Sequence, residues 1–139
     1  MASLVNTLSK RSCLTIDQNE QISNLALLLK KHNIGCLIVT DNASSKPVGI
    51  VSERDLVKYF KEIINKEVLI VRDIMTSNII SCDLSTTSND LMKKMTENKI
   101  RHLPIIDNDK LLGIVSIGDV VNRIIFNFEK ETKYLKEYI

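Results

Sequence analysis

The segment Gly-Ile-Val-Ser-Glu-Arg-Asp at Gly49–Asp55 returns as Gly-Ile-Val-Ser-Ile-Gly-Asp at Gly113–Asp119, 64 residues later. Upstream of this motif a shift of 66 residues aligns the two halves of the chain, and the two-residue difference falls in the polar segment Asn42–Lys46. The aligned pairs are Val5 with Val71, Leu8 with Ile74, Thr15 with Ser81, Asp17 with Asp83, Leu25 with Leu91, Ile34 with Ile100, and Asp41 with Asp107. Each copy is too small to bury its apolar faces well alone, so the duplication predicts two similar units that pair.

The composition predicts one soluble, intracellular unit. Apolar residues make up 44% of the 139 residues, yet no run approaches the roughly 20 apolar residues of a membrane span, and no signal-peptide pattern is present. Cys13, Cys36 and Cys82 lack metal-binding spacing and are expected to be buried free thiols in a reducing compartment, the cytoplasm. The 19 basic and 17 acidic residues are interspersed, which argues against a nucleic-acid partner.

Hydrophobic periodicity predicts the order strand, helix, strand, strand, helix in both copies, hence an α+β fold. In the first copy these elements are expected at Cys13–Ile16, Glu20–His32, Cys36–Val39, Val48–Val51 and from about Glu53. In the second copy they are expected at Ile79–Cys82, Thr87–Glu97, Leu103–Ile106, Leu111–Val115 and in a longer final helix.

The final helix carries an apolar stripe that leaves two arrangements open. The stripe consists of Val121, Ile124, Ile125, Phe128, Leu135 and Ile139. Burial of each large apolar side chain is worth roughly 1.5 to 3 kcal/mol, so the stripe should be covered. Either the helix folds back on its own unit, or it forms the seam of a homodimer, which is the commonest oligomer.

The repeated Ser-x-x-Asp also has two interpretations. Ser52 with Asp55, and Ser116 with Asp119, resemble capping boxes, which would make both pairs purely structural. A helix that begins directly after a strand, however, also offers free amides and a dipole to a phosphate. A carboxylate one turn inside can accept hydrogen bonds from ribose hydroxyls, so the motif also suits a nucleotide.

Together with Val-Arg-Asp-Ile-Met-Thr at Val71–Thr76 and Ile-Arg-His-Leu-Pro-Ile-Ile-Asp at Ile100–Asp107, the duplicated motif resembles a tandem pair of cystathionine β-synthase (CBS) domains, a Bateman module. The resemblance covers about residues 3–126 and extends to small stand-alone bacterial CBS-pair proteins. It implies β-α-β-β-α repeats at 3–66 and 67–126, packed about a pseudo-two-fold axis, with a helical extension at 127–139. It also implies a homodimer and an adenosine-containing ligand, AMP, ADP, ATP, NAD(H) or S-adenosylmethionine, between the repeats.

The resemblance assigns nucleotide-binding roles position by position. Asp55 and Asp119 would bind ribose diols, Ser52 and Ser116 would touch phosphate or ribose, and Thr15 and Ser81 would line the same cleft with hydroxyls. Backbone groups around Cys36, Leu37, His102 and Leu103 would meet the adenine edge, and Ile34, Ile100 and Met75 would pack on its faces. The two sites should differ, because Arg54 corresponds to Gly118, and Gly35-Cys36 correspond to Arg101-His102. Arg54, Arg101 and His102 could converge on phosphate, or could be solvated surface residues.

The favoured function is therefore a regulatory module that senses energy or redox state through an adenine nucleotide and signals to a separate, unidentified effector protein. The alternative is a constitutive interaction scaffold in which the motifs only cap helices. No phosphate loop, nucleophile elbow or zinc-binding spacing occurs, so neither catalysis, nor a metal, nor an obligatory cofactor is expected. No contact with a membrane is expected.

Overall fold

The computed structural model describes residues 3–11 and 13–137, which form an α+β structure of two compact units. Each unit is named here after the aspartate of its motif. The Asp55 unit comprises residues 13–80 and 109–111, and the Asp119 unit comprises residues 3–11, 81–108 and 112–137 of the described chain. No helix within the described residues is long and apolar enough to cross a membrane.

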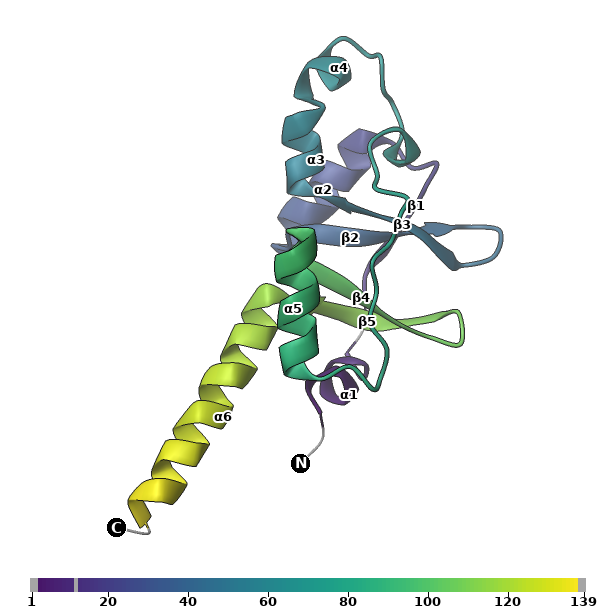
Figure 1. Ribbon diagram of the computed structural model, residues 1–139. Helices are drawn as coiled ribbons and strands as arrows, with labels where there is room; N and C mark the ends of the chain where they lie inside the picture. The colour runs from purple at the N-terminus through teal and green to yellow at the C-terminus, as the bar shows by residue number, and fades with distance from the viewer. Residues whose placement is uncertain (1–2, 12, 138–139) are drawn as a thin grey trace. The chain divides into compact units, whose positions relative to one another are not determined.

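The Asp55 unit is built on a three-stranded sheet of order β1-β2-β3, in which β1 runs parallel to β2 and β3 runs antiparallel to it (Figure 1). Its elements are β1 (Thr15–Asp17), α2 (Ile22–His32), β2 (Cys36–Asp41), β3 (Lys46–Ser52), α3 (Glu53–Lys58), α4 (Phe60–Ile64) and the 3-10 turn η1 (Val71–Asp73). The predicted helix after Glu53 is present, but Tyr59 ends it, and α4 begins at the next residue.

The Asp119 unit contains α1 (Leu4–Leu8), α5 (Ser88–Asn98), β4 (His102–Asp107), β5 (Lys110–Ser116) from residue 112 onward, and α6 (Ile117–Glu137). The strand predicted at Ile79–Cys82 is not formed. Only Cys82 pairs, in a single parallel bridge with Ile105, because its N–H donates to Pro104 (2.9 Å) and its carbonyl accepts from Ile106 (2.9 Å). The long final helix is confirmed; the predicted stripe residue Ile139 lies outside the described residues.

The internal repeat is a repeat of buried positions. Eight aligned pairs of residues are buried in both copies, which explains why the sequence periodicity recurs with the same register. These pairs are Val71 and Val5, Ile74 and Leu8, Ile16 and Cys82, Leu25 and Leu91, Leu29 and Met95, Leu37 and Leu103, Val39 and Ile105, and Val51 and Val115.

The segment that precedes each repeat belongs to the unit of the other repeat. Helix α1, which precedes the first copy, lies in the Asp119 unit, and η1, which precedes the second copy, lies in the Asp55 unit. At the end of η1, Thr76 exchanges backbone hydrogen bonds with Ile50 of β3 (3.0 and 2.9 Å). The sequence alignment matched these two segments. It did not predict that they form helical turns, or that each packs in the unit of the other repeat.

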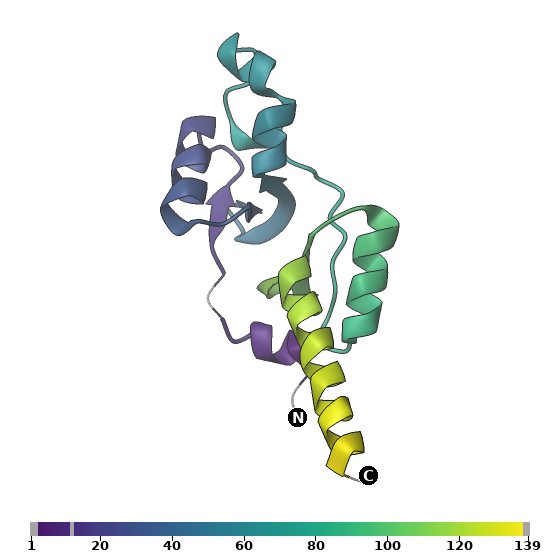
Figure 2. The same cartoon turned by 90° about the vertical axis from the view of Figure 1, so that its left-hand side faces the viewer.

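Within the Asp119 unit, α5 packs beside the first turns of α6, and α6 then continues well past it (Figure 2). The continuation leaves large apolar side chains on α6 exposed, Phe128 at 68% and Leu135 at 58% among them. The prediction that this helix folds back on its own unit is therefore met only by its first turns.

Candidate functional site

Both motif aspartates lie in the first turn of a helix and bond back to the serine that precedes it. In the Asp55 unit, the Ser52 amide and hydroxyl donate to Asp55 Oδ2 at 2.8 and 3.2 Å. In the Asp119 unit, the Ser116 amide and hydroxyl donate to Asp119 Oδ2 at 3.0 and 2.9 Å, and the Asp119 amide donates to Ser116 Oγ at 3.1 Å. The predicted capping contacts are therefore present in both copies, and both use the Oδ2 atom, so Oδ1 takes no part in them.

The first helical amide bonds each motif to the residue before the first strand of the strand pair, β2 in one unit and β4 in the other. The Glu53 N–H donates to the Gly35 carbonyl at 3.0 Å, and the Ile117 N–H donates to the Arg101 carbonyl at 2.8 Å. Each bond brings a predicted adenine-contacting segment, residues 34–36 or 100–102, next to the predicted ribose-binding aspartate. The same bonds occupy amides that a phosphate could otherwise use, so the helix N-termini offer less of an anion site than the sequence suggests.

The other predicted residues of the Asp55 unit surround this junction. Cys36 is buried and faces Ser52 across the β2–β3 ladder, and Thr15 is exposed on β1 opposite Ile38. Ile34 and Met75 are partly buried against the apolar core of the unit. Arg54 is exposed.

In the Asp119 unit, Ser81 precedes the single bridge at Cys82, and its carbonyl accepts a 2.8 Å hydrogen bond from Lys94 Nζ of α5. His102 begins β4, Ile100 is partly buried and Arg101 is exposed. Because Arg54 belongs to one unit whereas Arg101 and His102 belong to the other, their convergence stays a prediction.

Asp119 has a partner that sequence reasoning missed. Arg11 Nη2 lies 3.4 Å from Asp119 Oδ1, the carboxylate oxygen that takes no part in the helix cap. The two residues are 108 positions apart, and no spacing or motif in the sequence connects them. The contact depends on the exchange of α1 into the Asp119 unit.

Burial controls the chemistry of the cysteines. Burial, reinforced by the neighbouring Cys13 thiol and the Asp55 carboxylate, raises the pKa of Cys36 to about 12. Burial also raises the pKa of Cys82 to about 11, although the Lys94 ammonium works in the opposite direction. Both thiols are free and protonated at neutral pH, which makes them poor nucleophiles. Cys13 is free but only half-buried, so the expectation of three buried thiols is correct for two.

The comparison with protein-family models decides the family. The model of the CBS domain matches this chain twice, at residues 5–62 and 71–125, so each match contains one Ser-x-x-Asp motif. The chain belongs to the CBS domain family. Its curated relatives include the uncharacterized protein MK0525 of Methanopyrus kandleri, which is 33% identical over 96% of this chain and 70% of its own length.

Solved structures of CBS domains have the same fold. The CBS-domain containing protein ATU1752 from Agrobacterium tumefaciens is 36% identical, with a TM-score of 0.77 over 86% of this chain and 88% of its own. The CBS domain pair of MJ0100, in complex with 5′-methylthioadenosine and S-adenosyl-L-methionine, is 28% identical with a TM-score of 0.78 over 91% and 98%. CBSX2, in complex with AMP, is 25% identical with a TM-score of 0.76 over 90% and 97%.

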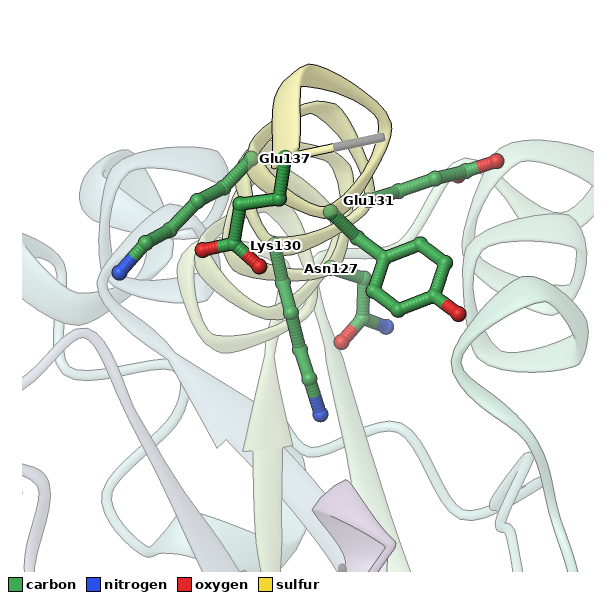
Figure 3. Close-up of a pocket in the computed structure, with 6 residues that line it drawn as sticks. Asn127, Lys130, Glu131 and Glu137 are labelled. Atoms are coloured by element: carbon green, nitrogen blue, oxygen red, sulfur yellow. The ribbon is translucent and has the colours of Figure 1, made fainter. Parts of the chain in front are cut away.

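Two hollows on the surface of this CBS pair lie away from the predicted site residues. One is lined by α6 alone, with Asn127, Lys130, Glu131, Lys133, Tyr134 and Glu137 around it (Figure 3). The other lies between the start of α5 and α6, beside Thr87, Ile124 and Phe128. A hollow on a single helix has no opposing wall and cannot enclose a nucleotide. Across residues 3–11 and 13–137, no cluster of three or more His, Cys, Asp or Glu side chains could hold a metal ion.

Proposed function

We propose that this CBS pair is a regulatory module that binds an adenine nucleotide, with AMP, ADP, ATP and NAD(H) as candidates, and signals to a separate effector protein. The observation that carries the proposal is the shared geometry of Asp55 and Asp119. Each takes part in its helix cap through Oδ2, which leaves Oδ1 out of the cap, and the first helical amide of each motif bonds to the segment that would meet the adenine edge. A carboxylate oxygen fixed in this way is a ready acceptor for a ribose hydroxyl.

The solved relatives support an adenosine-containing ligand. The MJ0100 and CBSX2 structures contain three such ligands between them: AMP, S-adenosyl-L-methionine and 5′-methylthioadenosine. The moiety common to all three is adenosine, so the proposal commits to adenosine recognition and leaves the group on its 5′ carbon to be measured. We propose no catalytic role and no obligatory cofactor.

The residues proposed for each role follow the family pattern. Asp55 and Asp119 bind ribose; Ser52, Ser116, Thr15 and Ser81 supply hydroxyls; Cys36, Ile34, Ile100 and Met75 surround the base; and Arg54, Arg101 and His102 bind phosphate. A ligand can change the arrangement of the two repeats only through a difference in affinity between two arrangements. That difference would be the signal that an effector reads in the cytoplasm.

The exposed face of α6 supports the homodimer. Val121, Ile125, Phe128 and Leu135 are exposed, and with Thr132 they follow one another at intervals of four, three, four and three residues. This is the spacing of a two-stranded coiled-coil seam, and a second copy of the same helix presents a matching stripe. The same face would serve the alternative scaffold function, in which a different protein covers it.

A thermal-shift titration of nucleotide-stripped protein tests the proposal. The panel contains AMP, ADP, ATP, NAD, NADH and S-adenosylmethionine, with GTP as the control, and sedimentation velocity on the same samples reports the dimer. A ligand at 100 times its Kd stabilises the protein by about 2.7 kcal/mol, which is a shift of several degrees. Asp55→Asn and Asp119→Asn keep the shape of the carboxylate and should each weaken binding.

The outcomes separate the two functions. A selective rise with one adenine ligand, reduced in either variant, supports the sensor. A flat response to the whole panel, from a protein that sediments as a folded dimer, contradicts it and favours the scaffold.

A further inference from the structure

The exchange of α1 into the Asp119 unit places an arginine at one proposed ribose site. Leu4, Val5 and Leu8 of α1 are buried, and the Leu8 carbonyl approaches β5 closely at Gly113. After the helix ends, the Arg11 amide donates to the same Leu8 carbonyl at 3.1 Å. The backbone at Arg11 is thus anchored by a buried helix, whereas its side chain is 61% exposed.

The carboxylate of Asp119 is shared between two partners. Oδ2 accepts from Ser116, and Oδ1 lies 3.4 Å from Arg11 Nη2. A ribose hydroxyl that bonds to Oδ1 therefore shares this oxygen with the guanidinium or displaces it. The contact is long and one partner is exposed, and such ion pairs are weak, so the arginine can be displaced.

The first copy has no equivalent. Asp55 makes the same contacts through Oδ2, but the residue 66 positions after Arg11 is Ser77, which carries no charge. The two proposed sites therefore differ in charge next to the aspartate, at a position outside the family motif.

We infer that Arg11 makes the Asp119 site selective for adenine ligands that carry a 5′-phosphate over neutral adenosine. This inference rests on the proposed function. A neutral nucleoside that takes Asp119 Oδ1 leaves the displaced guanidinium without an anionic partner. A ligand with a 5′-phosphate supplies a new one, which the planar fork of arginine can bind through two parallel hydrogen bonds.

The test measures the Kd of AMP and of adenosine by isothermal titration, in full-length protein and in the Asp55→Asn background, where the Asp119 site dominates. Arg11→Ala should weaken AMP roughly tenfold, the loss expected for one charge-assisted contact, and leave adenosine unchanged or slightly tighter. Arg11→Lys keeps the charge without the planar fork, so its Kd for AMP should lie between those of the wild-type protein and Arg11→Ala. Lys10→Ala removes the same charge from the neighbouring exposed residue and should change neither Kd.

The possible failures are distinguishable. If wild-type protein binds no member of the adenine panel and no adenosine, the proposed function is overturned and this inference with it. If wild-type protein binds adenosine at least as tightly as AMP, only this inference is overturned. If wild-type protein binds AMP and the ratio of the AMP and adenosine Kd values is the same in Arg11→Ala, the proposed function stands and the role of Arg11 is overturned. An equal rise in the ratio of the AMP Kd to the adenosine Kd for Lys10→Ala would show a general charge effect and also overturn the specific role.

Discussion

The two copies of the repeat share their buried positions and their helix caps. They differ in the helices that follow the motif and in the side chains that contact the motif aspartate. The first copy follows its motif with two short helices, α3 and α4, whereas the second continues into the 21 residues of α6. Among the residues that the structure describes, the Asp55 carboxylate bonds only to Ser52 of its cap, whereas Asp119 also contacts Arg11. We infer that the two copies have kept the buried residues and helix caps that each unit needs in order to fold. The residues at the edges of the units have diverged.

The largest expected effect on stability comes from substitution of the motif glycines. At Gly49 and at Gly113, the segment that precedes the other repeat packs directly against a strand. A Cβ at Gly49 would lie 2.7 Å from Met75 Sδ and 2.9 Å from the Thr76 carbonyl oxygen. A Cβ at Gly113 would lie 3.0 Å from the Leu8 carbonyl oxygen. Overpacking of this kind costs about 1 to 3 kcal/mol, so Gly49→Ala and Gly113→Ala should both lower the free energy of unfolding in urea, Gly49→Ala the more.

Gly118→Ala is the matched control for these two changes. Its Cβ would meet only Ser116 Oγ, at an ordinary 3.7 Å, and alanine favours a helix more than glycine does. The variant should be neutral or slightly stabilised. Equal losses at all three glycines would contradict the explanation by close approach and point to a backbone effect common to any glycine.

The next effect tests whether the two caps are equivalent. Asp55→Ala and Asp119→Ala should each cost about 1 kcal/mol of unfolding free energy through the lost cap. Asp119→Ala should cost a few tenths more at low salt because it also removes the ion pair with Arg11, and that excess should disappear in 1 M NaCl.

A double-mutant cycle checks the assignment of this excess. Arg11→Ala should lower stability slightly in the wild-type protein and not at all in the Asp119→Ala background. An excess that survives high salt, or an Arg11→Ala effect that is the same in both backgrounds, would show that the difference between the caps does not come from the ion pair.

The sequence predicted the elements that repeat and missed the contacts that the exchange of segments creates. The period of Leu25 and Leu29, and of Leu91 and Met95, reports one buried helix face, and local periodicity is enough to detect it. The partnership of Arg11 with Asp119 depends on where α1 packs, which no local pattern encodes. The prediction of a strand at Ile79–Cys82 was wrong for a related reason. Apolar residues predict burial, but within this segment only Cys82 pairs with a strand.

The smallest effect concerns the residues that end the first long helix of each copy. Asn33 after α2 and Lys99 after α5 are aligned, and both adopt the left-handed conformation, with φ of 51° and 55°. Their amides donate to equivalent carbonyls, Leu29 and Lys30 in one copy, Met95 and Thr96 in the other. Asparagine tolerates this conformation better than lysine, whose Cβ crowds the backbone.

Lys99→Gly should therefore raise the free energy of unfolding by about 0.5 to 1 kcal/mol, and Lys99→Asn by less. In the other copy, Asn33→Lys should lower stability by a similar few tenths, and Asn33→Gly should gain less than Lys99→Gly. Urea unfolding of the four variants measures the differences directly. If Lys99→Gly and Asn33→Gly gained the same amount, the asparagine would confer no advantage, and the two helix ends would be energetically as alike as their hydrogen bonds.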